Sequence, residues 1–243
     1  MFHSKTFLAF IGARGGSKGL KNKNIIGFAG KPLIHWTIQA ALKSRYIDRT
    51  IVSTDSQRIA NVARQGGAEV PFLRPGTLAR DTSPIEEALR HCLVWFEKNE
   101  QVRFDYLVLL QPTSPLRTAK HIDAAIQFYW ENRKSCEDTL ASVTLAPSKM
   151  GWLMASQAKG YVDFCFNSSR SKARRQDVPQ FFLPNGAIYI APAALIKKRV
   201  RNVFYRGRTL PFVMAPEVSV DIDSRHDLDE AKKLKKGQKN PNL

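Results

Sequence analysis

A glycine-rich and basic segment near the start of the chain has the composition of an anion-binding loop. Residues 12–19 read GARGGSKG and directly follow a short apolar run. Glycines let backbone N–H groups approach phosphate oxygens, and the side chains of Arg14, Lys18 and Lys23 would neutralise a triphosphate. The pattern is neither that of a P-loop nor that of a dinucleotide-binding loop. It predicts a phosphate-binding loop, with a basic surface turn as the alternative.

Two carboxylates near the end of the chain are candidate metal ligands. Residues 218–223 read VSVDID, so apolar and polar side chains alternate. Such alternation predicts a strand over 218–222, with Asp221 and Asp223 on one face and their Cα atoms roughly 6.5 to 7 Å apart. Magnesium prefers one or two carboxylates together with water and substrate phosphates. The alternative is a polar strand face beside a helix that begins near Ser224.

A third polar segment follows the apolar run at 106–110. Residues 111–115 read QPTSP, and the two prolines stiffen a loop that displays the amide of Gln111 and the hydroxyls of Thr113 and Ser114. Such groups suit a polyhydroxylated sugar. A loop with a purely structural role is the alternative.

The scaffold predicted for these segments is a mostly parallel α/β sheet. Apolar runs of strand length alternate with helical periodicity over the first 145 residues. Strands are predicted at 6–11, 51–54, 106–110, 139–145, 186–190, 212–214 and 218–222. Helices are predicted at 33–43, around 59–63, at 85–96 and 121–130, and over a final segment that contains Leu228, Ala231 and Leu234.

One region interrupts this alternation. From 147 to 184 the pattern loosens, while Val162, Phe164 and Phe166 alternate as in an antiparallel strand. We interpret it as an insertion, so that residues 1–243 form one α/β domain with a small lobe at about 147–184.

Composition limits the partners of the protein. A chain of 243 residues with 43% apolar residues can bury one substantial core. The formal net charge of +17 would attract nucleic acid, anionic membranes or small anions. The basic clusters lack the interleaved aromatic residues of single-strand binders, which favours small anionic substrates over nucleic acid. These clusters lie at 14–23, 170–175, 197–208 and 232–239.

The cysteines and the first residues indicate a compartment. Cys92, Cys136 and Cys165 are far apart and form no Cys-x-x-Cys pair, which suits a reducing cytoplasm. The apolar run at 7–11 is too short for a secretory signal or a membrane span. We therefore expect a soluble cytoplasmic protein that does not associate with membranes.

Eight blocks of the sequence follow one another in a characteristic order. The blocks are GARGGSKG at 12–19 with Lys23 and Asn24, IVSTD at 51–55, LRP at 73–75, DT at 81–82, LQPTSPLR at 110–117, RQ at 175–176, PNGAIY at 184–189 and DID at 221–223. Together they resemble one family, the acylneuraminate cytidylyltransferases, also called CMP-sialic acid synthetases. The resemblance extends over residues 6–234.

The resemblance implies a fold and a reaction. The fold would be the Rossmann-like, mostly parallel sheet of nucleotide-sugar transferases, and the lobe would make a homodimer. The reaction would transfer CMP from CTP to the anomeric C2 hydroxyl of a nonulosonic acid, with release of pyrophosphate. The resemblance also places Mg²⁺ at Asp221 and Asp223.

The resemblance further assigns roles to individual residues on the nucleotide side. Arg14 and Lys23 would hold the β- and γ-phosphates with Lys18 beside them, while Asn24 and Arg74 would fix the ribose and cytosine. Which of Lys18, Lys21 and Lys23 faces the α-phosphate stays open. The expected catalytic residues are Arg14, Lys18, Lys23, Asp221 and Asp223, and the expected nucleotide-binding residues are Ala13, Arg14, Gly15, Ser17, Lys23, Asn24 and Arg74.

On the sugar side, Arg175 resembles a residue suited to a carboxylate, which a guanidinium recognises in a bidentate manner. Tyr189 resembles a residue at the glycerol tail, and Phe204 with Tyr205 resembles an aromatic pair around the N-acyl group. Core packing is the alternative for these three aromatic residues. The full expected set is Gln111, Thr113, Ser114, Lys149, Arg175, Tyr189, Phe204 and Tyr205.

Other substrates remain open. Sister synthetases act on legionaminic, pseudaminic or 3-deoxy-manno-octulosonic acid, and residues 184–189 favour a sialic or legionaminic substrate by resemblance. Leu183 stands where some sialic acid synthetases have arginine, which disfavours N-acetylneuraminate itself. A nucleic-acid-binding protein of the same fold is the remote alternative.

Overall fold

Six strands form the central sheet of the computed structural model, which describes residues 2–16, 19–147, 150, 153–156, 162–165 and 180–237. The strands are β1 (Phe7–Gly12), β4 (Arg49–Ser53), β5 (Tyr106–Leu109), β6 (Thr139–Leu145), β9 (Phe182–Pro192) and β10 (Thr209–Val213). Their order across the sheet is β10, β6, β9, β5, β1, β4. β1 is parallel to β4 and β5, and β6 to β10, whereas β9 is antiparallel to both β5 and β6. The predicted mostly parallel sheet is therefore confirmed.

Helices cover both faces of this sheet, because alternate residues of the central strands are buried on opposite sides. On β1, Phe7, Ala9 and Ile11 belong to one core cluster, and Leu8 and Phe10 to another. The first cluster includes residues of α1, α2 and α4, and the second includes residues of α3 and α5. These helices are α1 (Leu33–Leu42), α2 (Gln57–Gln65), α3 (Ile85–Asn99), α4 (Ala119–Asn132) and α5 (Ala193–Lys197).

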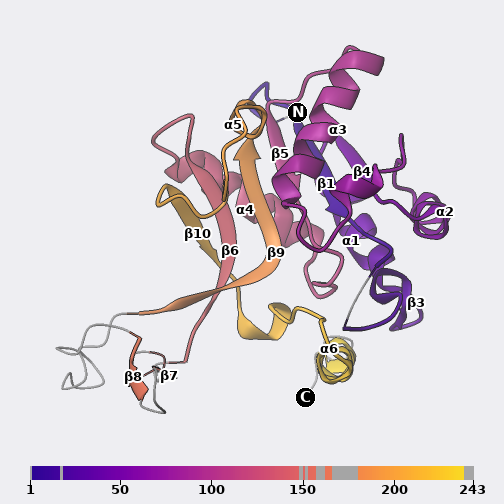
Figure 1. Ribbon diagram of the computed structural model, residues 1–243. Coiled ribbons are helices and arrows are strands. Elements are labelled where there is room, and N and C mark those ends of the chain that lie inside the picture. The colour runs from indigo at the N-terminus through magenta and orange to yellow at the C-terminus, as the bar shows by residue number, and fades with distance from the viewer. Residues whose placement is uncertain are drawn as a thin grey trace.

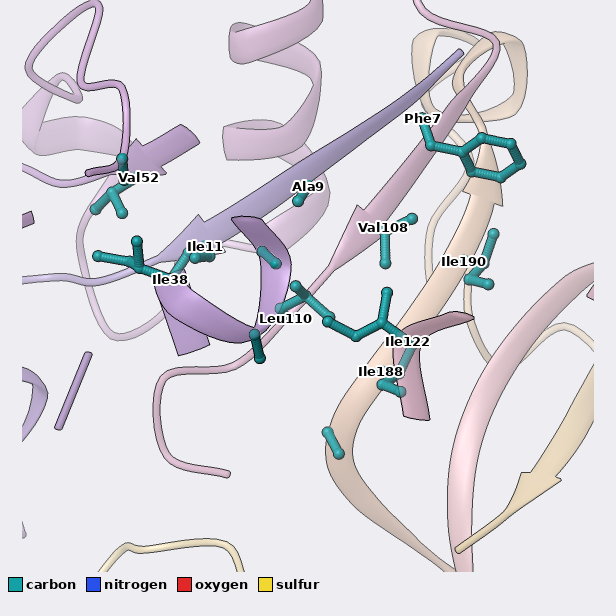
Figure 2. Packing of buried hydrophobic residues seen from close by; sticks show 14 of the residues in the cluster. Phe7, Ala9, Ile11, Ile38, Val52, Val108, Leu110, Ile122, Ile188 and Ile190 are labelled. Atoms are coloured by element: carbon teal, nitrogen blue, oxygen red, sulfur yellow. The ribbon is translucent and has the colours of Figure 1, made fainter. Parts of the chain in front are cut away.

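The first cluster is the larger one, and Figure 2 shows part of it. Ile38 of α1 and Ile122 of α4 belong to it together with Val108 of β5 and Ile190 of β9. Strands enclosed in this way need apolar side chains at every position, which explains the continuous apolar runs in the sequence.

A third cluster fixes the last helix, α6 (Arg225–Gly237), to the rest of the molecule. Leu228 and Ala231 of α6 are buried with Phe28, which lies in a small hairpin of β2 (Gly27–Phe28) and β3 (Lys31–Pro32). The ring of Trp36 contacts two ammonium groups, with Lys31 Nζ at 3.7 Å and Lys235 Nζ at 4.3 Å from its centroid. Residues just before α6 are thereby held near the first loop of the chain.

β9 is irregular in its middle. Its register against β6 shifts between Ala141 and Val143, whose partners are Tyr189 and Pro184, so β9 carries extra residues there. Gly186 lies in this bulge with φ at 71°, a conformation that favours glycine. The bulge turns this part of β9 out of the regular ladder.

Asn185 fills the bulge and links three segments. Its Oδ1 accepts hydrogen bonds from Ser142 Oγ at 2.5 Å and from the backbone N–H of Ala187 at 3.2 Å. Its Nδ2 donates to Ser219 Oγ at 2.9 Å. The Asn185 side chain is buried, so these bonds connect β6, β9 and the chain before α6 within the core.

Beyond the bulge, β6 and β9 run away from the helices toward a hairpin of β7 (Met154–Ser156) and β8 (Val162–Phe164) (Figure 1). The antiparallel strand predicted at Val162 and Phe164 is confirmed. Phe166 and most of the lobe predicted at 147–184 lie outside the described residues, so the dimerisation role stays a prediction.

The strand predicted over 218–222 is wrong. Pro216–Val218 forms a 3₁₀ turn, and the residues after it pair with no strand in the described part of the chain. β10 already occupies this edge of the sheet, and the following segment instead contacts a loop, with the Ile222 N–H donating to the Thr113 carbonyl at 2.9 Å. The apolar side chains of this segment, such as Ile222, pack in the third core cluster, whereas Asp221 and Asp223 line a cavity. This arrangement explains why apolar and polar residues alternate in the sequence.

The described helices include none that is both long enough and apolar enough to cross a membrane.

We expect Asn185→Ala to lower the free energy of unfolding by about 1–3 kcal/mol, because it leaves buried groups of Ser142 and Ala187 without their partner. Chemical denaturation of the variant and the wild type measures this change. Asn61→Ala, an exposed position on α2, is the control and should change stability by less than about 0.5 kcal/mol. Equal stabilities for Asn185→Ala and the wild type would contradict the role given to this side chain.

Candidate functional site

A cavity of about 710 Å³ opens where β1 and β5 end. The carboxyl ends of strands in an open α/β sheet are where ligands bind, since the loops there are not tied into the sheet. Six stretches far apart in the sequence supply its walls. Its lining residues are Gly12, Arg14, Gly19, Lys23, Asn24, Arg74, Leu78, Ala79, Arg80, Asp81, Ser83, Ile85, Leu109, Gln111, Pro112, Thr113, Tyr189, Phe204, Tyr205, Asp221 and Asp223.

The loop after β1 is fastened by its backbone. The Ala13 N–H donates to the Ser53 carbonyl at 3.0 Å, the Gly15 N–H to Asp55 Oδ1 at 2.8 Å, and Asn24 Nδ2 to the Arg14 carbonyl at 3.0 Å. These bonds direct Arg14, Lys23 and Asn24 to the cavity. Ala13 and Gly15, which the sequence places with the nucleotide, do not line it, and their amides already have acceptors.

Arg14 and Lys23 each pair with a carboxylate that lines the cavity. Arg14 forms an ion pair with Asp81, and Lys23 Nζ lies 2.5 Å from Asp223 Oδ1. An anionic ligand that binds Arg14 and Lys23 must therefore compete with Asp81 and Asp223. Gly19 lies so close to this region that a Cβ there would meet the Asp223 carbonyl oxygen at 2.8 Å.

Arg74 is held rigidly at the wall of the cavity. Its Nε donates to Ser53 Oγ at 3.0 Å and its Nη2 to the Ser53 carbonyl. Burial lowers the pKa of this guanidinium, an effect that Asp55 opposes and Arg14 reinforces. A fixed donor of this kind can read a polar group on a ligand.

Asp221 lies at the base of the cavity with an unsatisfied oxygen. Oδ1 is buried and has no hydrogen-bond partner among the described residues. Burial raises the pKa of Asp221, a hydrogen bond with Thr113 lowers it, and the negative charge of Asp223 raises it again. A partly buried carboxylate with one unpaired buried oxygen is suited to a cation.

The pair of Asp221 and Asp223 fits the chemistry of Mg²⁺. Within the described part of the chain, no three side chains of His, Cys, Asp or Glu gather into a metal site. Magnesium does not require such a cage, because it binds through one or two carboxylates and completes its shell with water and phosphate. The orphaned Asp221 oxygen agrees with that arrangement.

The polar loop after β5 forms another wall. Gln111 and Thr113 line the cavity, whereas Ser114 is fully buried and does not. A Cβ on Gly186 would lie 2.7 Å from Gln111 Oε1 and 3.2 Å from Asp221 Oδ2, so the β9 bulge brings these two side chains together. The amide and the carboxylate are therefore neighbours over one glycine.

Three aromatic residues complete this side. The Tyr189 ring packs on Phe204 with centroids 5.0 Å apart, and its hydroxyl is 2.9 Å from that of Tyr205. Tyr205 is exposed and Tyr189 is buried, and burial with the Tyr205 hydrogen bond raises the pKa of Tyr189. Tyr205 is exposed and lines the cavity, so the alternative of core packing alone does not hold for this residue.

Four predicted site residues, Ser17, Lys18, Lys149 and Arg175, lie outside the described residues. Conversely, the cavity contains Arg80, Asp81 and Ser83, for which the sequence suggested no role. Asp81 belonged to one of the resembling blocks, and that was the available signal. Its pairing with Arg14 depends on a contact across 67 positions of sequence, which no local pattern reveals.

Residues 8–239 match the sequence model of a protein family that is described as Cytidylyltransferase. This chain belongs to the cytidylyltransferase family. The resemblance found in the sequence is therefore confirmed.

Within the family, the chain is 38% identical over 229 residues to the CMP-N,N'-diacetyllegionaminic acid synthase of Legionella pneumophila, covering 93% of this chain and 95% of that relative. It is 35% identical over 225 residues to the N-acylneuraminate cytidylyltransferase of Escherichia coli O18:K1:H7, covering 92% of this chain and 51% of that relative. The chain thus spans about half the length of the N-acylneuraminate cytidylyltransferases that it matches.

Solved cytidylyltransferases share the fold. A CMP:2-keto-3-deoxy-manno-octonic acid synthetase complexed with CTP superposes with a TM-score of 0.70 at 15% identity, covering 96% of this chain and 99% of that one. Identity this low shows common architecture alone, and it confirms the predicted fold class.

We expect Gly186→Ala to disturb the site, because a left-handed backbone with a Cβ is strained and that Cβ would displace the Gln111 amide. The free energy of unfolding should fall by about 1–3 kcal/mol, and a crystal structure should show Gln111 moved away from Asp221. Gly27→Ala is the control, since a Cβ there meets nothing within 4 Å. An unmoved Gln111 in a variant of wild-type stability would refute this account of the bulge.

Proposed function

We propose that residues 1–243 act as one cytidylyltransferase domain that transfers CMP from CTP to the anomeric C2 hydroxyl of a nonulosonic acid and releases pyrophosphate. The observation that carries the proposal is the meeting of two unlike walls in one cavity. One wall presents cations and a rigid arginine, and the other presents an amide, hydroxyls and aromatic rings. Membership of the cytidylyltransferase family supports the same reaction.

The cationic wall suits CTP. Arg14 and Lys23 can neutralise the β- and γ-phosphates once their ion pairs with Asp81 and Asp223 have opened. Arg74, held by Ser53, and the buried Asn24 lie deeper and suit the ribose and base. Mg²⁺ held by Asp221 and Asp223 would supply charge neutralisation at the phosphates when bound.

The opposite wall suits the acidic sugar. Gln111 and Thr113 offer an amide and a hydroxyl beside Asp221, while Tyr189, Phe204 and Tyr205 offer an aromatic surface with two hydroxyls. We infer that Arg175 and Lys149 bind the same substrate, as the family resemblance suggests.

The reaction requires the two substrates to meet beside Asp221. The C2 oxygen forms a bond to the α-phosphorus as the bond from that phosphorus to the β-phosphate oxygen breaks, and the hydroxyl proton passes to solvent or to a base. The protein contributes mainly position and charge neutralisation in such a transfer. The proximity of Gln111 to Asp221 supports this arrangement.

We further propose that the protein is a homodimer in the cytoplasm, where CTP is supplied. Large apolar side chains are exposed at the ends of β6 and β9 and beside β7, namely Leu145, Leu153, Met154, Phe182 and Leu183. Such a group of apolar residues is typical of a protein interface. Light scattering after size-exclusion chromatography should give twice the mass of one chain, and a monomer at micromolar concentration would refute the proposal.

The central experiment incubates the protein with CTP, Mg²⁺ and each member of a panel of nonulosonic acids, with pyrophosphate release as the readout. N-acetylneuraminic, N,N'-diacetyllegionaminic, pseudaminic and 3-deoxy-manno-octulosonic acid form the panel. We expect release with a sialic or legionaminic acid, no release with ATP in place of CTP, and reversible loss in EDTA. A protein that consumes CTP with none of these acids would contradict the proposed function.

We expect Asp221→Asn to reduce turnover by about 100-fold or more, because it removes a charged ligand beside the reacting phosphate. Stability at neutral pH should not fall. Burial raises the pKa of Asp221, so its ionised form is disfavoured in the folded state and a neutral amide relieves that cost.

Steady-state kinetics and thermal unfolding with and without Mg²⁺ check both parts of this prediction. Asp229→Asn is the matched control, since Asp229 lies on α6 and pairs there with Arg225 and Lys232. It should keep wild-type turnover. Stabilisation by Mg²⁺ that persists in Asp221→Asn would argue against the metal assignment.

A further inference from the structure

Arg117 is an arginine enclosed entirely within the protein. It is 2% exposed and forms no ion pair with a carboxylate among the described residues. Burial lowers the pKa of its guanidinium to about 9. Burying an unpaired cation is costly, and a neutral side chain could fill the same volume at less cost. Its bonds indicate what the guanidinium does.

The bonds that Arg117 makes join two walls of the cavity. Nη1 donates to the Gln111 carbonyl at 3.2 Å and to the Ala187 carbonyl at 2.9 Å. Gln111 begins the loop after β5, and Ala187 follows Gly186 in the β9 bulge. One donor group therefore ties the polar loop to the bulge behind the cavity.

The side chain of Gln111 depends on this tie. Its Oε1 lies within 2.7 Å of the position of a Cβ on Gly186, so a shift of either backbone changes the gap between them. Thr37 Oγ1 also donates to the Gln111 carbonyl, at the longer distance of 3.3 Å. Arg117 alone among these donors reaches both sides of the gap.

The same loop also fixes the carboxylates. The Thr113 carbonyl accepts the Ile222 N–H, which lies between Asp221 and Asp223. Movement of the loop after β5 would thus be passed on to Asp221. Two further donors of Arg117, Nε and Nη2, are buried without an acceptor in the described part of the chain. The two bonds of Nη1 are therefore the hydrogen bonds by which the guanidinium can act on its surroundings.

We propose that Arg117 is a positioning residue for the acidic sugar, acting by clamping the Gln111 loop to the β9 bulge so that the Gln111 amide is held beside Asp221. This rests on the proposed function for the identity of the substrate. Arg117 touches neither substrate itself, since it does not line the cavity.

The test compares Arg117→Lys, which keeps a cation with one donor group, and Arg117→Met, which removes the donors. The kcat/KM for the sugar acid should fall by about 10-fold in the lysine variant and about 100-fold in the methionine variant, as expected for a small misplacement. The KM for the sugar acid should rise, whereas the KM for CTP should stay within about twofold of wild type, because Arg14, Lys23 and Arg74 are held by partners other than Arg117. Equal rises in the two KM values would overturn the proposal.

A double-mutant cycle separates positioning from stability. Because Arg117 acts through the Gln111 side chain, Arg117→Lys should reduce sugar kcat/KM far less in a Gln111→Ala background than alone. Additive losses would show that Arg117 does not act through Gln111. Arg133→Lys is the control, since Arg133 donates to the Tyr106 hydroxyl at the opposite end of β5 and should leave both KM values unchanged.

Hydrogen exchange tests the clamp independently of activity. In Arg117→Lys, amides of 110–116 and 186–188 should exchange faster than in wild type, while those of α2 should not change. Unaltered exchange in both segments would overturn the clamp whatever reaction the enzyme performs. If the wild type is inactive with the whole panel, but Arg117→Lys still exchanges faster in these segments, the proposed function is refuted and the clamp is retained.

Discussion

The antiparallel strand β9 is the constraint on which the rest of the structure depends. It is bonded on one side to β5 and on the other to β6, so it joins the β5–β1–β4 part of the sheet to the β6–β10 part. The strands on both sides of it point the same way, and their carboxyl ends open to the same region. A bulge can form at this position because the core holds the strand from both faces, and Asn185 satisfies the groups that the bulge releases.

Charge is distributed unevenly in this protein. A chain with a net charge of +17 lines its cavity with three carboxylates, those of Asp81, Asp221 and Asp223, and pairs Arg14 and Lys23 with two of them. The excess positive charge elsewhere on the surface would raise the local concentration of anions. In the proposed function, selection among those anions would fall to fixed groups in the cavity such as Arg74, which is hydrogen-bonded to Ser53.

The sequence predicted the scaffold well because its signals are local. β6 has the bounds predicted for it, and α1 ends within one residue of the prediction, since burial on both faces requires an uninterrupted apolar run. The direction of β9 was beyond such reasoning, because antiparallel pairing with β5 and β6 is decided by contacts far away in sequence. The segment at 218–222 misled for a related reason: alternation describes any chain that lies between an apolar surface and a polar one. Arg117 escaped notice because an arginine in a loop usually faces solvent.

The ion pairs that line the cavity have a consequence for turnover. When a phosphate replaces Asp81 at Arg14, or Asp223 at Lys23, one charge-assisted contact is exchanged for another. The binding free energy of a polyanion is then the difference between the free energy of the new ion pairs and that of the ion pairs they replace. Its magnitude is therefore much smaller than the sum over the new ion pairs alone. In the proposed reaction, Asp81 and Asp223 would re-form their ion pairs with Arg14 and Lys23 as pyrophosphate departs. These two acids would therefore act as internal counterions that favour release of the product.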